Sequence, residues 1–106
     1  MRQTDQSAPS ELLDECDRLR RLRDARWYDA LHYVRTEPEE TDLLRQLRGN
    51  ITRAHRLLVR LHVGSHSSAE AEKVSELLEA VARDFGELLL LRPDVLLVLG
   101  VRLEDV

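Results

Sequence analysis

Apolar side chains recur every three or four residues through the middle of the chain, which places them on one face of an α-helix. One run predicts a helix over about 37–63, and it keeps its phase through Gly49 although glycine is unfavourable inside a helix. A second run predicts a helix that ends near Leu91, because Pro93 disfavours helical angles at the residue before it. The two runs are Leu44, Leu47, Ile51, Ala54, Leu58 and Leu61, and then Ala71, Val74, Leu78, Val81, Phe85 and Leu88.

Both runs are preceded by residues typical of a helix start. Thr36 and Glu39 have the spacing of a capping box, in which each side chain accepts a hydrogen bond from the other residue's backbone N–H. Ser67 and Glu70 repeat this spacing shortly after Gly64, and glycine is common at helix ends. We therefore expect two consecutive long helices with a short connection between them.

The segments on either side of these helices are less regular. Residues 1–9 are polar and predict a disordered tail. Spacings of three and four then favour a helix over about 10–35, with a possible break near Asp24, where charged residues blur the pattern. The last segment, PDVLLVLGVRL, is almost continuously aliphatic and fits either a strand or a short helix to about Leu103. We favour the helix, because a lone strand would have no partner in an otherwise helical chain.

The predicted fold is all-α. Three long antiparallel amphipathic helices and a short C-terminal helix form a helical bundle, as a single domain over residues 10–106. An alternative breaks the chain at Asp24, Gly49 and Gly86 and produces six shorter helices. That size and number of helices resemble death-fold domains, an analogy of fold alone.

Composition limits the chemistry that the chain can perform. Its 106 residues are 42% hydrophobic and 34% charged, and few are aromatic, so the predicted core consists mostly of leucine and valine. Cys16 is the only cysteine, which excludes an internal disulfide and a cysteine-based zinc site. The chain begins without a hydrophobic segment and has no apolar stretch of membrane-spanning length. We expect a cytoplasmic protein with no cofactor and no membrane partner.

The net charge is −4, but the two signs are separated along the chain. Residues 43–69 hold five arginines, three histidines and no acid, whereas residues 70–87 hold six acids. Such charges can pair across the seam between neighbouring helices. The alternative is an anion-binding or nucleic-acid-binding face formed by Arg53, Arg56 and Arg60. The acidic chain and the lack of an aromatic residue among these arginines argue against nucleic acid.

One pair of histidines has the spacing of metal ligands. His62 and His66 are four residues apart, as two ligands on one helix would be. Gly64 lies between them, however, and no acidic residue nearby could supply a third ligand. We therefore expect no metal site.

Three segments, RWYDALH, RGNITRAH and RLLVRLH, place an arginine before a histidine with five or six residues between them. This spacing resembles the Arg–His motif of HEPN-type ribonucleases. The resemblance would imply a helical RNA-handling protein that uses Arg48, His55, Arg56 and His62. In that family a polar residue directly follows the arginine. In these three segments that position holds a tryptophan, a glycine or a leucine instead.

The aliphatic C-terminal run determines the preferred function. Its seven large side chains exceed what a short helix lying on a bundle can bury on one face, so we expect a second copy of the chain to cover part of it around a two-fold axis. The alternative is that a compact globule encloses the run. The preferred function is a non-enzymatic protein–protein interaction module, such as an adaptor, a regulator or a small subunit of an assembly, that forms a homodimer. Its predicted interface anchors are Val95, Leu96, Leu99 and Leu103.

Overall fold

All the regular structure in the described part of the chain is helical, which confirms the predicted all-α class. A computed structural model describes the backbone of residues 3–62, 64 and 68–106, and their side chains except those of residues 3–11, 62 and 103. The elements are α1 (Gln3–Arg23), α2 (Trp27–His32), α3 (Pro38–His62), α4 (Ser68–Leu91), α5 (Pro93–Leu99) and the 3-10 turn η1 (Leu103–Asp105).

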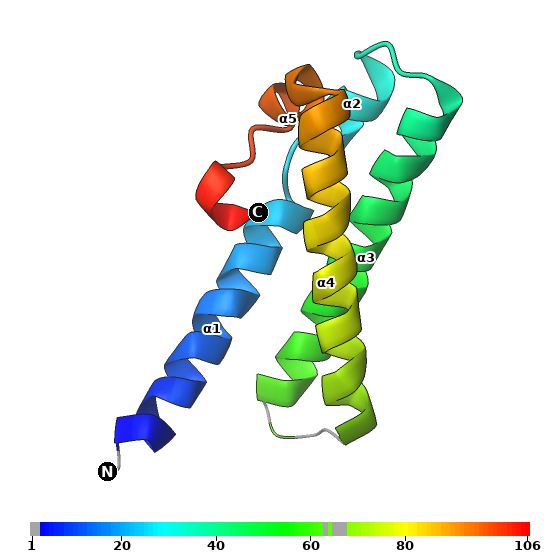
Figure 1. The fold of residues 1–106 in the computed structure, drawn as a ribbon. Coiled ribbons are helices and arrows are strands. Elements are labelled where there is room, and N and C mark those ends of the chain that lie inside the picture. The colour runs from blue at the N-terminus through cyan, green and yellow to red at the C-terminus, as the bar shows by residue number, and fades with distance from the viewer. Residues whose placement is uncertain (1–2, 63, 65–67) are drawn as a thin grey trace.

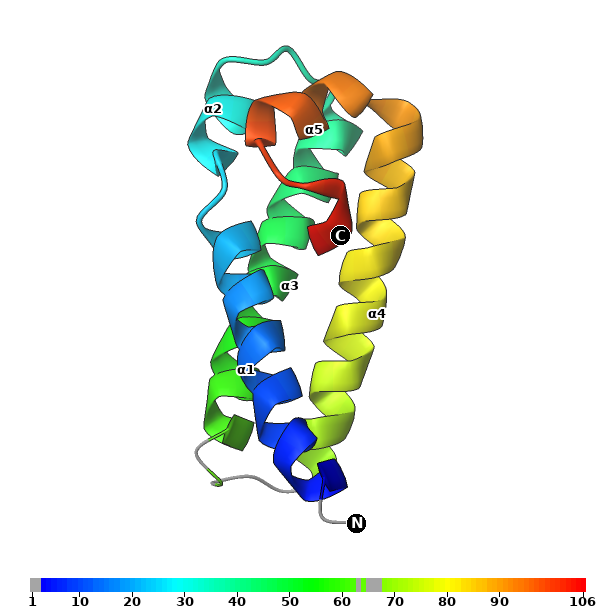
Figure 2. The ribbon, with the colours of Figure 1, turned by 90° about the vertical axis from the view of Figure 1, so that its left-hand side faces the viewer.

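The three long helices form an elongated bundle (Figure 1). They run alternately up and down, and α3 lies between α1 and α4 and packs against both (Figure 2). The two short helices, α2 and α5, lie together at the end of the bundle opposite the N-terminus. The described residues extend over 51 × 24 × 21 Å. The up-down-up arrangement and the short C-terminal helix agree with the predicted architecture.

The core is mainly aliphatic, and it takes residues from every helix. The stripe predicted on α3 is confirmed, while the buried face of α4 includes Leu77, and Ala71 at its start is exposed. Every one of these helices is too short or too polar to cross a lipid bilayer within the described residues. The buried apolar residues are Cys16, Leu19, Leu22, Trp27, Ala30, Leu44, Leu47, Ile51, Ala54, Leu58, Val74, Leu77, Val81, Phe85, Leu88, Val95, Leu96 and Leu99.

The possible break near Asp24 is present, because α1 ends at Arg23 and α2 begins at Trp27. The change of direction brings the indole of Trp27 into the core, where its Nε1–H donates a hydrogen bond of 2.8 Å to the Leu22 carbonyl oxygen. This bond satisfies a carbonyl at the end of α1 that has no partner within the helix. The first helix also begins at Gln3, earlier than the predicted residue 10.

The start of α3 differs from the predicted capping box by one residue. The backbone N–H of Glu37 donates to a carboxylate oxygen of Glu40 at 2.9 Å, while the hydroxyl of Thr36 lies 2.7 Å from that of Thr41. Pro38 occupies the first helical position, where its missing N–H costs nothing. The second predicted box involves Ser67, which lies outside the described residues.

The six-helix alternative is wrong, because α3 runs without a break through Gly49 and α4 through Gly86. The apolar stripes on both helices continue past these glycines, and burying a single leucine contributes about 1.5–3 kcal/mol. That exceeds the ~1 kcal/mol that a glycine costs inside a helix. Burial of the stripe therefore keeps each helix continuous.

A third glycine does end a helix. Gly100 has a left-handed φ of +73°, and its N–H donates to the carbonyl oxygens of Leu96 and Leu97, both at 3.1 Å. This C-cap stops α5 at Leu99, short of the predicted end near residue 103.

Two glycine-to-alanine substitutions are expected to have opposite effects on stability. Gly49→Ala should raise the free energy of unfolding by about 0.5–1 kcal/mol, because a Cβ there would meet only the end of the Arg53 side chain, at 3.8 Å. Gly100→Ala should lower it by about 1–2 kcal/mol, because a Cβ disfavours the left-handed backbone. Urea denaturation followed by circular dichroism measures both changes. A stabilising Gly100→Ala would contradict the assigned C-cap.

Candidate functional site

The predicted interface anchors need correction, because most of them belong to the core. The exposed fractions of Val95, Leu96 and Leu99 are 0%, 6% and 1%, and the side chain of Leu103 lies outside the described residues. The helix that carries them, α5, packs across the end of the bundle against α2 and α4. The carbonyl oxygen of Leu99 also accepts a hydrogen bond of 3.1 Å from the backbone N–H of Arg26. The bundle thus buries side chains that were expected to need a second copy of the chain.

Other leucines of the same region remain exposed. Leu90 and Leu97 are 86% and 82% exposed, and Leu90 is flanked in the sequence by the less exposed Leu89 and Leu91. These four residues, at the last turn of α4 and on α5, are here called the leucine corner. The continuous aliphatic sequence causes this exposure, because a helix with apolar residues on every side can bury only some of them against one bundle.

An apolar groove adjoins the leucine corner. It has a volume of about 260 Å³. Leu89 belongs to both the corner and the groove, and Leu96 reaches the groove from α5. Gly86 leaves its floor open, since a Cβ at that position would meet no other atom within 4 Å. The groove is lined by Ala82, Phe85, Gly86, Leu89, Leu96 and Val106.

Arg92, the residue between α4 and α5, fixes the geometry of the corner. Its guanidinium donates to Asp94 at 2.8 and 3.0 Å and to Glu40, in the first turn of α3, at 2.6 Å. Hydrogen bonds with Asp94 and Glu40 raise the pKa of Arg92 above its ordinary value. The carboxylates neutralise this cation, and the bond to Glu40 connects the corner to α3.

The C-terminal segment is held against α1. The guanidinium of Arg21 donates two hydrogen bonds, of 3.0 and 3.2 Å, to the buried carboxylate of Asp105, and Arg18 donates to the Asp105 carbonyl oxygen at 2.5 Å. The hydrogen bonds from Arg21 lower the pKa of Asp105 below its ordinary value. They also position the neighbouring Val106, which lines the apolar groove. Sequence reasoning missed this contact, because 84 residues separate its partners.

The three arginines of the predicted anion-binding face are all exposed on α3, but they differ in their contacts. Arg53 donates to the side-chain oxygen of Asn50 on its own helix, and Arg60 pairs with Glu70 on α4. Arg56 forms no hydrogen bond or ion pair within the described part of the chain. The Arg60–Glu70 pair fits the predicted charge matching across the seam of α3 and α4.

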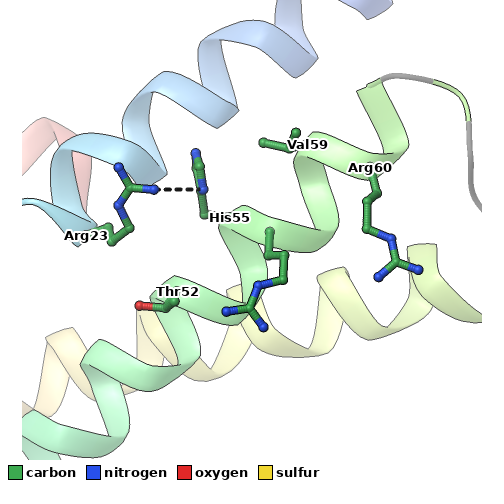
Figure 3. Close-up of a pocket in the computed structure, with 6 residues that line it drawn as sticks. Arg23, Thr52, His55, Val59 and Arg60 are labelled. Carbon is green, nitrogen blue, oxygen red and sulfur yellow. Dashed lines mark hydrogen bonds between the residues drawn. The ribbon is translucent and has the colours of Figure 1, made fainter.

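A basic pocket lies between the end of α1 and the middle of α3 (Figure 3). We use this name for a pocket of about 360 Å³ lined by Arg23, Thr52, His55, Arg56, Val59 and Arg60. Arg23 and His55 lie side by side, with 3.4 Å between Nη1 of Arg23 and Nδ1 of His55. Because a guanidinium can only donate, Nδ1 accepts and the ring proton is on Nε2. Burial, together with the charge of Arg23, lowers the pKa of His55.

Two of the three Arg–His pairs suggested by sequence spacing do not meet, and the third includes a side chain outside the described residues. His32 stacks on Tyr28, with ring centroids 4.1 Å apart, instead of contacting Arg26. His55 contacts Arg23 on another helix instead of Arg48. The side chain of His62 lies outside the described residues, as does His66 of the predicted metal-ligand spacing. No group of three metal-binding side chains occurs among the residues that the structure describes.

Comparison with known proteins provides no relative from which to transfer a function. No protein-family model, no curated protein and no solved structure matches the chain. The leucine corner with its groove and the basic pocket are therefore the features from which a function can be argued.

Proposed function

We propose that the protein is a non-enzymatic interaction module that forms a homodimer through the leucine corner and its groove. The observation that carries this proposal is the exposure of Leu90 and Leu97, at 86% and 82%, in a region that also holds an apolar groove. Single exposed leucines are common on protein surfaces, but Leu89, Leu90 and Leu91 are consecutive and Leu89 also lines the groove, which is typical of a binding surface. Burying a leucine contributes about 1.5–3 kcal/mol, so covering this region favours association.

A second copy of the chain is the occupant that best fits this surface. In a two-fold dimer the same surface is used on both subunits, so a leucine of each corner can enter the groove of the other subunit. The charge at the corner does not oppose this contact, because Asp94 and Glu40 neutralise Arg92. In the proposed dimer, exposed leucines of the same region therefore take the role of the predicted interface anchors.

The expected dimer is weak and depends on concentration. The leucine corner comprises only four leucine side chains, whereas a stable interface buries about 800 Å² on each partner. Polar residues of α4 would have to supply the remainder. A small number of buried apolar anchors can nevertheless dominate the binding energy. Reversible association suits the role of an adaptor, a regulator or a small subunit of an assembly.

Light scattering coupled to size-exclusion chromatography tests the proposed dimer. The wild-type mass should rise from 12.3 kDa toward twice that value as concentration increases. The double variant Leu90→Glu/Leu97→Glu should remain at the monomer mass, because burying two carboxylates in the interface is costly. Leu13→Glu/Val59→Glu is the matched control, since it adds the same charge at exposed apolar residues of α1 and α3.

Two results would contradict the proposed dimer. One is a wild-type protein that stays monomeric up to millimolar concentration. The other is equal dissociation in both double variants, which would show that added negative charge, not the leucine corner, controls association.

We also propose a reducing compartment, the cytoplasm, as the site of action. The only cysteine, Cys16, is unpaired and buried among apolar residues. Burial raises the pKa of its thiol, with Asp17 and Glu15 adding to the effect. A buried thiol of raised pKa behaves as a small hydrophobic residue rather than a nucleophile.

A further inference from the structure

We propose that the basic pocket binds the phosphate group of a small organic phosphate, such as a phosphate monoester. The pocket takes cations from two helices, with Arg23 at the end of α1 and Arg56 and Arg60 on α3 (Figure 3). Arginine suits phosphate because its planar guanidinium can donate two parallel hydrogen bonds to phosphate oxygens. This site is separate from the proposed dimer surface, since the two share no lining residue.

The cations of the pocket outnumber the acids that pair with them. Arg23 is bound to Asp24 and Arg60 to Glu70, but Arg56 has no such partner among the described residues. Residues 43–69, which include all the pocket residues of α3, contain no acid. A phosphate monoester carries about −1.5 to −2 charges at neutral pH, so it can supply the missing counter-charge.

His55 adds a neutral donor to the pocket. Its Nδ1 is occupied by the contact with Arg23, so the N–H of Nε2 remains for a ligand oxygen. The ring is partly buried and lines the pocket, on the same helix as Arg56. A neutral donor that Arg23 already orients needs no proton uptake to bind an anion.

The size and lining of the pocket favour an organic phosphate over the inorganic ion. Small-molecule sites commonly have volumes of about 300–1,000 Å³, and the pocket has about 360 Å³. Val59, 39% exposed, provides an apolar wall, to which the aliphatic parts of the arginines add. The ligand class that matches this lining has a phosphate group at one end and a compact apolar or aromatic body at the other.

A nucleic acid fits the surroundings less well than a small molecule. The chain has a net charge of −4, and the acidic residues Glu72, Glu76 and Glu79 line a hollow on α4. This acidic balance disfavours a long polyanion, and no tryptophan, tyrosine or phenylalanine lines the basic pocket as a platform for stacked bases. A small phosphate needs only the pocket.

Titration of the 106-residue chain with phenyl phosphate, followed by ¹H–¹⁵N NMR, tests this inference. Saturable shifts are expected for the amides of Arg23 and residues 52–60, with weaker shifts for inorganic phosphate and none for phenol. Arg56→Gln and Arg23→Gln should each weaken phenyl phosphate binding by about tenfold, since each removes a charged donor. The matched control is Arg45→Gln, which removes an exposed arginine of α3 outside the pocket and should leave affinity unchanged.

Three outcomes would overturn the inference. Phenyl phosphate without saturable shifts at millimolar concentration would exclude the site. Equal weakening by Arg45→Gln and Arg56→Gln would indicate attraction to the whole helix instead of the pocket. Tighter binding of a single-stranded oligonucleotide than of phenyl phosphate, with all three arginines contributing equally, would indicate a nucleic-acid surface. Because dimer formation is measured separately on Leu90 and Leu97 variants, failure of one proposal leaves the other intact.

Discussion

Replacing Trp27 with alanine is expected to lower the free energy of unfolding by about 3–5 kcal/mol. The indole is only 2% exposed and is among the largest fully buried side chains of the described core. Its removal would leave a cavity at the α1–α2 junction and would also take the hydrogen-bond donor from the Leu22 carbonyl oxygen. Urea denaturation followed by circular dichroism at 222 nm measures the change, since that signal does not depend on tryptophan.

Two further substitutions separate the contributions at this junction. Trp27→Phe keeps most of the apolar burial and removes only the indole donor, while the Leu22 carbonyl oxygen keeps the 3.3 Å hydrogen bond from the Ala25 N–H, so its cost should be smaller than that of Trp27→Ala. Tyr28→Ala is the matched control, because the neighbouring aromatic residue is 62% exposed and should change stability by no more than about 0.5 kcal/mol. A cost below about 1 kcal/mol for Trp27→Ala would contradict the buried position of the indole.

The second large effect concerns α5. Leu99→Ala should lower the free energy of unfolding by about 2–5 kcal/mol, because Leu99 is 1% exposed within the core. Leu97→Ala should change it by no more than about 0.5 kcal/mol, because Leu97 is 82% exposed. Both substitutions remove the same atoms from the same short helix. Their difference, measured by urea denaturation at protein concentrations where the chain is monomeric, reports which face of α5 is buried.

The reverse order would show that the face assigned to the core is wrong. If Leu97→Ala were the costly substitution and Leu99→Ala were neutral, α5 would present Leu99 on the surface of the subunit, where it could act as the interface anchor predicted from sequence. Equal costs would place both leucines in the core and would remove Leu97 from the proposed dimer surface. Leu96→Asp cannot distinguish these cases, because a carboxylate at this buried position would destabilise the fold itself.

The long helices could be predicted from sequence because their apolar spacing is regular. The predicted range 37–63 agrees with α3, and Pro93 indicated the end of α4 near Leu91. The break near Asp24 was visible only as a weakened pattern. Trp27, the first residue after the break, is buried, and its burial depends on where the bundle places the core, so residue spacing alone could suggest the break but not establish it.

The position of α5 could not be predicted for a different reason. An aliphatic run in which nearly every residue is apolar contains no periodicity, so it does not indicate which face is buried. Tertiary packing makes that choice by placing Val95, Leu96 and Leu99 against the bundle. The expectation of surplus apolar surface concerned the right region but named residues of the wrong face.

The candidate sites depend on contacts that are distant in sequence. The partners in the Arg23–His55 contact are 32 residues apart, and those in the Arg21–Asp105 ion pair are 84 apart. Residue spacing identifies partners only within one helix, which is why it suggested Arg48 for His55. The three arginines on α3 could be found from sequence because they share a helix, whereas the contribution of α1 to the pocket requires the packed bundle.

The chain contains a single tryptophan, Trp27, and this determines what its intrinsic fluorescence can detect. Trp27 begins α2, which packs against α5 at one end of the bundle (Figure 1). Tryptophan emission from the native protein therefore reports the environment of that end. Separation of α3 from α4 at the far end of the bundle would not change this emission.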